Sequence, residues 1–124
     1  MTRLRKSTLA VVAGLALLVA AAIAAAFAHH ERSPQVVRIS VKRFAYAPAE
    51  FVLKKGMPTV LELRSEDVVH GFNAPDLGVR ADIVPGQVVR VRVVPGKAGR
   101  FVFHCDIFCG TGHEDLQGIV TVIE

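Results

Sequence analysis

The sequence predicts an all-β sandwich preceded by one apolar helix, and three observations lead to this prediction. After residue 28, roughly seven short segments alternate apolar with polar residues or are rich in β-branched ones, as half-buried strands are. Glycine- and proline-containing turns separate these segments at short intervals. No segment after residue 28 has a convincing helical period. Several short strands without helices are typical of two packed β-sheets.

The N-terminal segment has the composition of a membrane anchor. Three basic residues, at positions 3, 5 and 6, precede twenty uncharged residues, 9–28. A helix rising about 1.5 Å per residue crosses a hydrocarbon core of ~30 Å with twenty residues. Basic residues before the span put the N-terminus in the cytoplasm and the remainder outside. A cleaved signal peptide is the alternative, because residues 26–28 (Ala-Phe-Ala) have the small-x-small form of a cleavage site.

The apolar run is longer than the ~7–15 residues of a usual signal-peptide core, which favours an uncleaved anchor. We therefore expect an anchor or signal segment over residues 1–28 and a polar linker over 29–35. A single domain over 36–124 would lie on the outer or periplasmic face. In the linker, His29 and His30 are expected to be a solvated pair beside the membrane.

The strands are expected in the following order. Residues 36–41 place Val37, Ile39 and Val41 on one face. Residues 44–48 are expected to form a bend, and residues 73–85 a loop punctuated by proline and glycine. The other expected strands are 50–53, 59–64, 89–93, 100–104 and 119–123.

The charge of the exported domain excludes one class of partner. The formal net charge is +4, but from residue 29 onward 12 basic residues face 11 acidic ones. The domain is therefore nearly neutral, and no basic stripe with interleaved aromatic residues points to nucleic acid. No nucleophile–base pair or phosphate-binding loop is present either, so we expect no enzyme acting alone.

The most informative stretch is the cysteine loop, residues 105–116. Cys105, Cys109 and His113 recur at every fourth residue, which would place them on one face of a helix. Gly110 and Gly112 would each cost a helix roughly 1 kcal/mol, so a loop between strands is the better interpretation. Thiolates together with an imidazole favour copper or zinc over magnesium or calcium.

A ligand from outside this loop is needed to complete a metal site, and His70 is the candidate. It stands next to a glycine at the end of an expected strand, about 35 residues before the cysteines. A structural histidine is the alternative. His104, beside Cys105 on a strand, should point to the opposite side, as a surface histidine.

For the cysteines, a disulfide is the alternative to metal binding, since exported proteins commonly form one. A bond between Cys105 and Cys109 would close a small ring, which gains little stability because the gain grows with loop length. It would also require neither the two glycines nor His113 in register.

At this point the motifs resemble a known family. The domain is similar to the cupredoxin fold, and within it to the CuA domain of cytochrome c oxidase subunit II. The segment around His70 matches a D-V-x-H-x-F setting, followed by Pro-Asp-Leu-Gly at 75–78 and a Pro-Gly turn at 85–86. The loop pattern Cys-x-Glu-x-Cys-Gly-x-x-His-x-x-Met is met by Cys105, Cys109, Gly110 and His113. The resemblance covers essentially the whole exported domain.

The resemblance implies a Greek-key β-sandwich and copper, with two ions in a CuA-type site. In the family, two bridging thiolates and two imidazoles hold the ions, which assigns His70, Cys105, Cys109 and His113. The family's glutamate, which binds through its backbone carbonyl, corresponds to Ile107, and its methionine, a weak axial ligand, to Leu116. Loss of a weak axial ligand should shift the redox potential more than the affinity.

The implied function is electron transfer by an exported, membrane-anchored protein similar to oxidase subunit II. The implied partner is a redox protein such as a cytochrome c or the catalytic subunit of an oxidase, to which any oxidase activity would belong. The family receives electrons through an aromatic patch, whereas this chain has no tryptophan. Phenylalanines 101, 103 and 108 are expected to form a dry shell around the loop.

Two other copper functions stay open from the sequence. One is a metallochaperone with mononuclear Cu(I) bound by Cys105, Cys109 and a histidine, which Leu116 in the methionine position favours. The other is a mononuclear type 1 site formed by His70, one cysteine and His113, which would leave a spare thiol.

Overall fold

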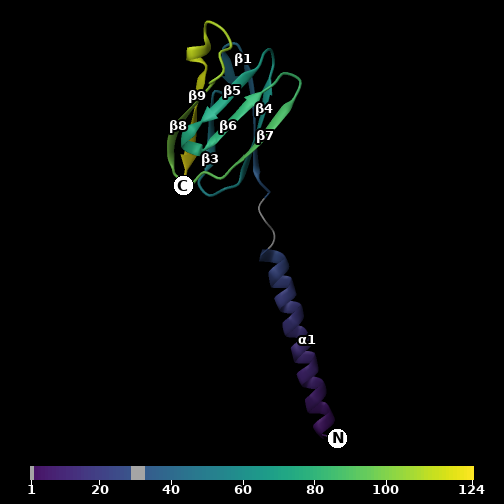
Figure 1. Ribbon diagram of the computed structural model, residues 1–124. Helices are drawn as coiled ribbons and strands as arrows, with labels where there is room; N and C mark the ends of the chain where they lie inside the picture. The colour runs from purple at the N-terminus through teal and green to yellow at the C-terminus, as the bar shows by residue number, and fades with distance from the viewer. Residues whose placement is uncertain (1, 29–32) are drawn as a thin grey trace. The chain divides into compact units, whose positions relative to one another are not determined.

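The computed structural model describes residues 2–28 and 33–124, which belong to two compact units, Met1–Ser33 and Pro34–Glu124 (Figure 1). In the first unit, helix α1 (Thr2–Ala28) agrees with the prediction of one N-terminal helix. Its segment Arg5–Ala26 is long and apolar enough to cross a membrane, by length and composition, and a signal sequence meets the same criteria. The histidine pair at 29 and 30 lies outside the described residues.

The second unit is a sandwich of two sheets (Figure 1). One sheet has the order β2-β1-β4-β7, formed by β2 (Ala45–Ala47), β1 (Gln35–Lys42), β4 (Thr59–Ser65) and β7 (Val88–Val93). The other has the order β3-β9-β8-β5-β6, formed by β3 (Glu50–Lys54), β9 (Gln117–Ile123), β8 (Gly99–His104), β5 (His70–Ala74) and β6 (Val79–Ile83). Short 3₁₀ turns occupy Pro75–Leu77 and His113–Asp115. The predicted all-β sandwich with one N-terminal helix is confirmed.

Alternating side chains of the two sheets form the core. In the first sheet, β1 runs parallel to β4 and pairs Ile39 with Leu63, so both side chains lie on the buried face. In the second sheet, Phe103 is fully buried and stacks on Phe72 with ring centroids 4.9 Å apart. Tyr46 packs edge-on against Phe103 at 5.0 Å. This aromatic cluster supports the end of the sandwich on which the cysteine loop lies.

Three details of the sequence prediction are wrong. Residues 73–85 are no loop, because β5 and β6 pair there as an antiparallel hairpin. Proline and glycine in the connecting turn concealed this hairpin, although β6 itself alternates apolar and polar residues (Val-Arg-Ala-Asp-Ile). The bend at 44–48 contains the short strand β2, which pairs with β1. The predicted linker 29–35 lies partly outside the described residues, and its last residue, Gln35, already begins β1.

Candidate metal centre

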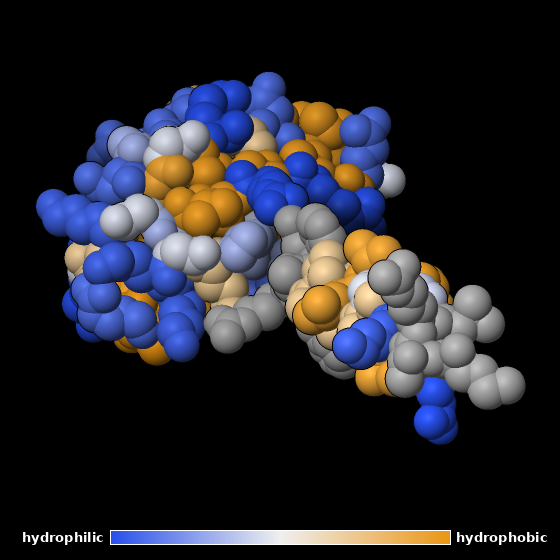
Figure 2. All heavy atoms as spheres, turned by 90° about the horizontal axis from the view of Figure 1, so that it is seen from below, coloured by the Kyte–Doolittle hydropathy of each residue, from blue (hydrophilic) through white to orange (hydrophobic). Residues whose placement is uncertain are grey.

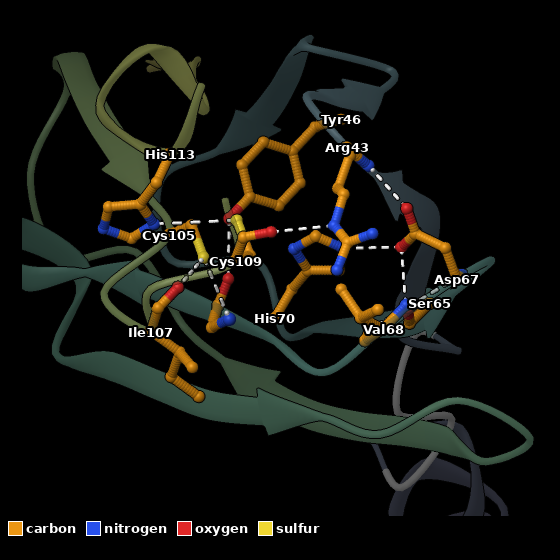
Figure 3. Close-up of polar contacts among 11 residues, drawn as sticks. Arg43, Tyr46, Ser65, Asp67, Val68, His70, Cys105, Ile107, Cys109 and His113 are labelled. Atoms are coloured by element: carbon orange, nitrogen blue, oxygen red, sulfur yellow. Dashed lines mark hydrogen bonds and ion pairs between the residues drawn. The ribbon is translucent and has the colours of Figure 1, made fainter. Parts of the chain in front are cut away.

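Two neighbouring strands bring the central donors together. His70 is the first residue of β5, Cys105 directly follows β8, and the two strands pair in the same sheet. One donor atom each of His70, Cys105 and Cys109 lies within 4.8 Å of the other two, and all three residues are buried (Figure 3). Both cysteines are free thiols. Three of the predicted ligands thus form one compact cluster.

The other two predicted ligands lie against the same thiols. His113, in the 3₁₀ turn that follows the loop, has its Nδ1 3.6 Å from the Cys109 sulfur, outside the three-residue cluster. The carbonyl oxygen of Ile107 accepts a hydrogen bond from the Cys105 thiol at 3.1 Å. His113 and His70 lie on opposite sides of the two sulfurs (Figure 3). The five predicted residues are therefore neighbours, with one imidazole at each side of a thiol pair.

The hydrogen bonds of His70 leave one ring nitrogen available to a metal. Its Nε2 lies 2.7 Å from Oδ1 of Asp67, and this contact orients the ring. Its Nδ1 is buried and has no hydrogen-bond partner among the described residues. An unsatisfied buried polar atom costs about 1–3 kcal/mol, so Nδ1 is suited to a ligand that the protein itself does not supply. A carboxylate that orients a metal-binding histidine in this way is common at metal sites.

Asp67 is itself held in place. Burial alone would raise its pKa, but hydrogen bonds from the backbone N–H of Arg43, from His70 and from its Val68 neighbour lower the pKa to about 2. The carboxylate is therefore ionised at neutral pH and keeps accepting the imidazole N–H. By contrast, burial and the proximity of Cys105 raise the pKa of Cys109 to about 11. This thiol is protonated near neutral pH, so a metal has to displace its proton on binding.

We expect Asp67→Asn to lower copper affinity by about 10–100-fold, the usual effect of removing the partner of a ligating histidine. The fold should persist, because asparagine has nearly the same shape and its side-chain oxygen can still accept a backbone hydrogen bond. Competition with a chelator of known affinity measures the change. Glu66→Gln is the matched control, since this adjacent exposed carboxylate has no contact with His70 among the described residues. Equal affinities of the two variants would contradict the role given to Asp67.

Two residues of the turn between β1 and β2 contact the cysteine loop. The Arg43 side chain donates from Nε to the carbonyl oxygen of Cys109 at 2.8 Å. The Phe44 ring covers Gly110 and Gly112, where an added Cβ atom would come within 2.8 and 2.5 Å of ring carbons. Sequence reasoning missed Arg43 and Phe44, since nothing in a stretch 66 residues away from Cys109 signals this contact. The Phe44 ring therefore explains why glycine occupies both loop positions.

We expect Gly112→Ala to destabilise the domain by about 1–3 kcal/mol, the usual cost of overpacking. The cause is mainly steric, because the φ of Gly112 is −96°, outside the left-handed region that favours glycine. Urea denaturation of the metal-free protein measures the loss. In the Phe44→Ala background the same substitution should cost clearly less, since the obstructing ring is gone. An unchanged cost in that background would show that the ring is not the obstacle.

The surroundings of the thiols differ from the sequence prediction in one respect. Phe103 is buried and Phe101 is half-buried, as expected, but Phe108 is 77% exposed. The expectation that Phe108 shields the loop is therefore wrong: it projects outward from the loop, with its ring centroid 5.7 Å from that of His113. Leu116 is fully buried as part of the core. His104 is half-buried and does not belong to the donor cluster.

Comparison with known proteins gives this arrangement a family. Residues 14–122 match the family described as Cupredoxin-like domain. A curated relative, cytochrome c oxidase subunit 2 of Thermus thermophilus, is 31% identical over 81 residues, which are 65% of this chain. The chain spans 60% of that relative's length.

Two solved structures share the fold. The periplasmic domain of subunit II of cytochrome oxidase (CoxB) of Bradyrhizobium japonicum is 18% identical with a TM-score of 0.68, covering 75% of this chain and 86% of that one. The metal-binding domain of the Cu(I)-exporting P-type ATPase CopA of Streptococcus pneumoniae D39 is 25% identical with a TM-score of 0.61, covering 76% and 90%. The chain belongs to the cupredoxin-like family, and its domain is homologous to subunit II of cytochrome c oxidase.

Proposed function

We propose that the chain is an exported, membrane-anchored electron-transfer protein with a CuA-type dicopper site. The proposed ligands are His70, Cys105, Cys109 and His113 with the backbone carbonyl of Ile107. One observation carries the proposal: two imidazoles flank a buried pair of free thiols from opposite sides. Two thiolates between two histidines match the donor set of a thiolate-bridged metal pair, and thiolate–imidazole sites favour copper or zinc.

The residues around the thiols have distinct roles in this proposal. Asp67 orients His70 through the Nε2 contact, and Arg43 fixes the carbonyl of Cys109. The backbone N–H of Gly71 donates to the Cys105 sulfur at 3.3 Å and so helps to fix the position of this sulfur. Tyr46 and Phe103 are buried, and the Tyr46 hydroxyl donates to the carbonyl oxygen of Gly71 at 2.6 Å. Copper, when bound, would supply a one-electron redox couple, while this rigid surround limits rearrangement of the ligands.

The proposed partner is a redox protein, either a cytochrome c or the catalytic subunit of an oxidase. Homology to an oxidase subunit supports this choice. Phe108 adds an exposed apolar side chain beside His113, at the place where a partner would reach the site most directly. Helix α1 as a retained anchor, with the domain on the periplasmic face, agrees with the basic residues that precede the span.

Copper loading tests the proposal. The purified protein is reduced, loaded with copper and studied for stoichiometry, optical absorption and electron paramagnetic resonance on one sample. We expect two copper ions per chain, a purple colour and one unpaired spin shared by both nuclei. One colourless, spin-silent Cu(I) per chain would overturn the electron-transfer function.

The alternative function is a Cu(I) carrier, and specific observations favour it. His70, Cys105 and Cys109 already form a compact three-donor cluster without His113. Leu116 offers no donor in the position where the subunit II pattern has methionine. The structural likeness to a domain solved with Cu(I) is in line with both. A carrier should release its single copper rapidly to a competing thiol ligand, whereas an electron-transfer site should retain both ions.

A further inference from the structure

The end of the domain farthest from the cysteine loop is a connected platform. We call residues 34–36, 54–58, 92–100 and 122–124 the basic end. Strand β8 begins there at Gly99 and ends at His104 beside the metal centre, so the two regions lie at opposite ends of the sandwich. Backbone hydrogen bonds of 2.8–3.1 Å join its segments: Gln35 to Pro58, Lys55 to Ile123 and Gly56 to Pro95.

Apolar side chains are exposed on this platform. Val36, Val94 and Ile123 are 43%, 51% and 50% exposed. Figure 2 views the molecule from this side and shows an apolar area bordered by hydrophilic residues. These exposed apolar side chains are available to contact an external surface.

The basic end carries a surplus of positive charge. At the basic end, Lys54, Arg92, Lys97 and Arg100 are exposed and have no ion pair among the described residues. Its one acidic residue, Glu124, is paired with Lys55 at 2.6 Å. The basic end therefore suits an anionic partner.

The short connection between α1 and β1 points to a membrane as that partner. Seven residue steps separate Ala28, the end of α1, from Gln35, the start of β1, and such a segment reaches at most about 25 Å in any conformation. Gln35 belongs to the basic end. If α1 spans a membrane, Gln35 therefore lies within about 25 Å of the end of that span.

We propose that the basic end rests on the membrane surface and binds anionic phospholipid headgroups. The unpaired lysines and arginines contact lipid phosphates, and Val36, Val94 and Ile123 enter the interfacial region, as exposed apolar side chains beside basic ones do. The inference rests on the proposed membrane anchoring, but on no property of the copper site.

A single tryptophan reports on this contact, because the chain has none of its own. We would place it by Val94→Trp at the basic end and, as a control, by Val84→Trp in the loop after β6 at the other end. The full-length variants are reconstituted into vesicles of phosphatidylcholine with brominated acyl chains, with or without phosphatidylglycerol. Circular dichroism verifies the fold, and no copper is required.

With phosphatidylglycerol we expect a blue shift and strong bromine quenching for Val94→Trp and neither for Val84→Trp. Added salt or the pair Lys54→Glu and Lys97→Glu should abolish the effect, since both weaken the attraction to lipid charge. The matched reversal of Lys42 and Arg64 to glutamate, away from the basic end, should leave it intact. Absent quenching at Val94→Trp, or equal quenching at both positions, would overturn the proposal and leave this end to a protein partner. A failure of copper loading would not affect these results.

Discussion

Replacing Cys105 with serine is expected to abolish stoichiometric copper binding while the fold persists. Serine keeps the size of the side chain and can still donate to the Ile107 carbonyl. It cannot supply the soft thiolate that copper prefers, because the ligating form of cysteine is the deprotonated sulfur. The loss should exceed the roughly 10–100-fold expected for Asp67→Asn, which only orients a ligand. Isothermal titration with Cu(I) under a chelator buffer measures it.

Leu116→Met is the informative companion variant. It restores a sulfur donor at the position where the subunit II pattern has methionine, in a buried site that already accommodates a side chain of similar volume. We expect copper binding to persist and the redox potential to change.

Retention of full copper affinity in Cys105→Ser would remove Cys105 from the ligand set and contradict any thiolate-bridged pair.

The second large effect concerns stability: Phe103→Ala is expected to lower the free energy of unfolding by about 3–5 kcal/mol. Phe103 is fully buried between the sheets and contacts the rings of Tyr46, Phe51 and Phe72. Small domains have a total stability of only about 5–15 kcal/mol, so the variant should be near the limit of folding. Urea denaturation of the metal-free protein, followed by far-ultraviolet circular dichroism, gives the value.

Phe108→Ala makes the same chemical change at an exposed site. Because the Phe108 side chain is 77% exposed, its removal should change the free energy of unfolding by no more than about 0.5 kcal/mol. The difference between the two variants isolates burial from residue type. A comparable loss in Phe108→Ala would mean that the loop packs against the domain more closely than this structure indicates.

The alternation of apolar and polar residues was sufficient to predict most of the strands. Strands β1, β4 and β7 alternate apolar and polar residues because each buries one face only, and these strands were predicted to within a residue or two at their ends. The hairpin of β5 and β6 was missed because His70, Gly71 and Asn73 interrupt an apolar pattern in β5. In β5, tertiary packing rather than local pattern decides the strand, since its residues are enclosed by the neighbouring strands and the cysteine loop.

The sequence by itself predicted which residues are candidate donors, because thiols and imidazoles at Cys-x₃-Cys-Gly-x₂-His spacing, with one upstream histidine, are typical of a site for copper or zinc. Only the tertiary structure decided how the donors are held: Arg43 reaches the Cys109 carbonyl and Asp67 the His70 ring. It also decided that Phe108 points outward and Phe103 inward. The reason is physical, since these contacts join strands distant in sequence, and no local pattern encodes which distant backbone atom a side chain meets.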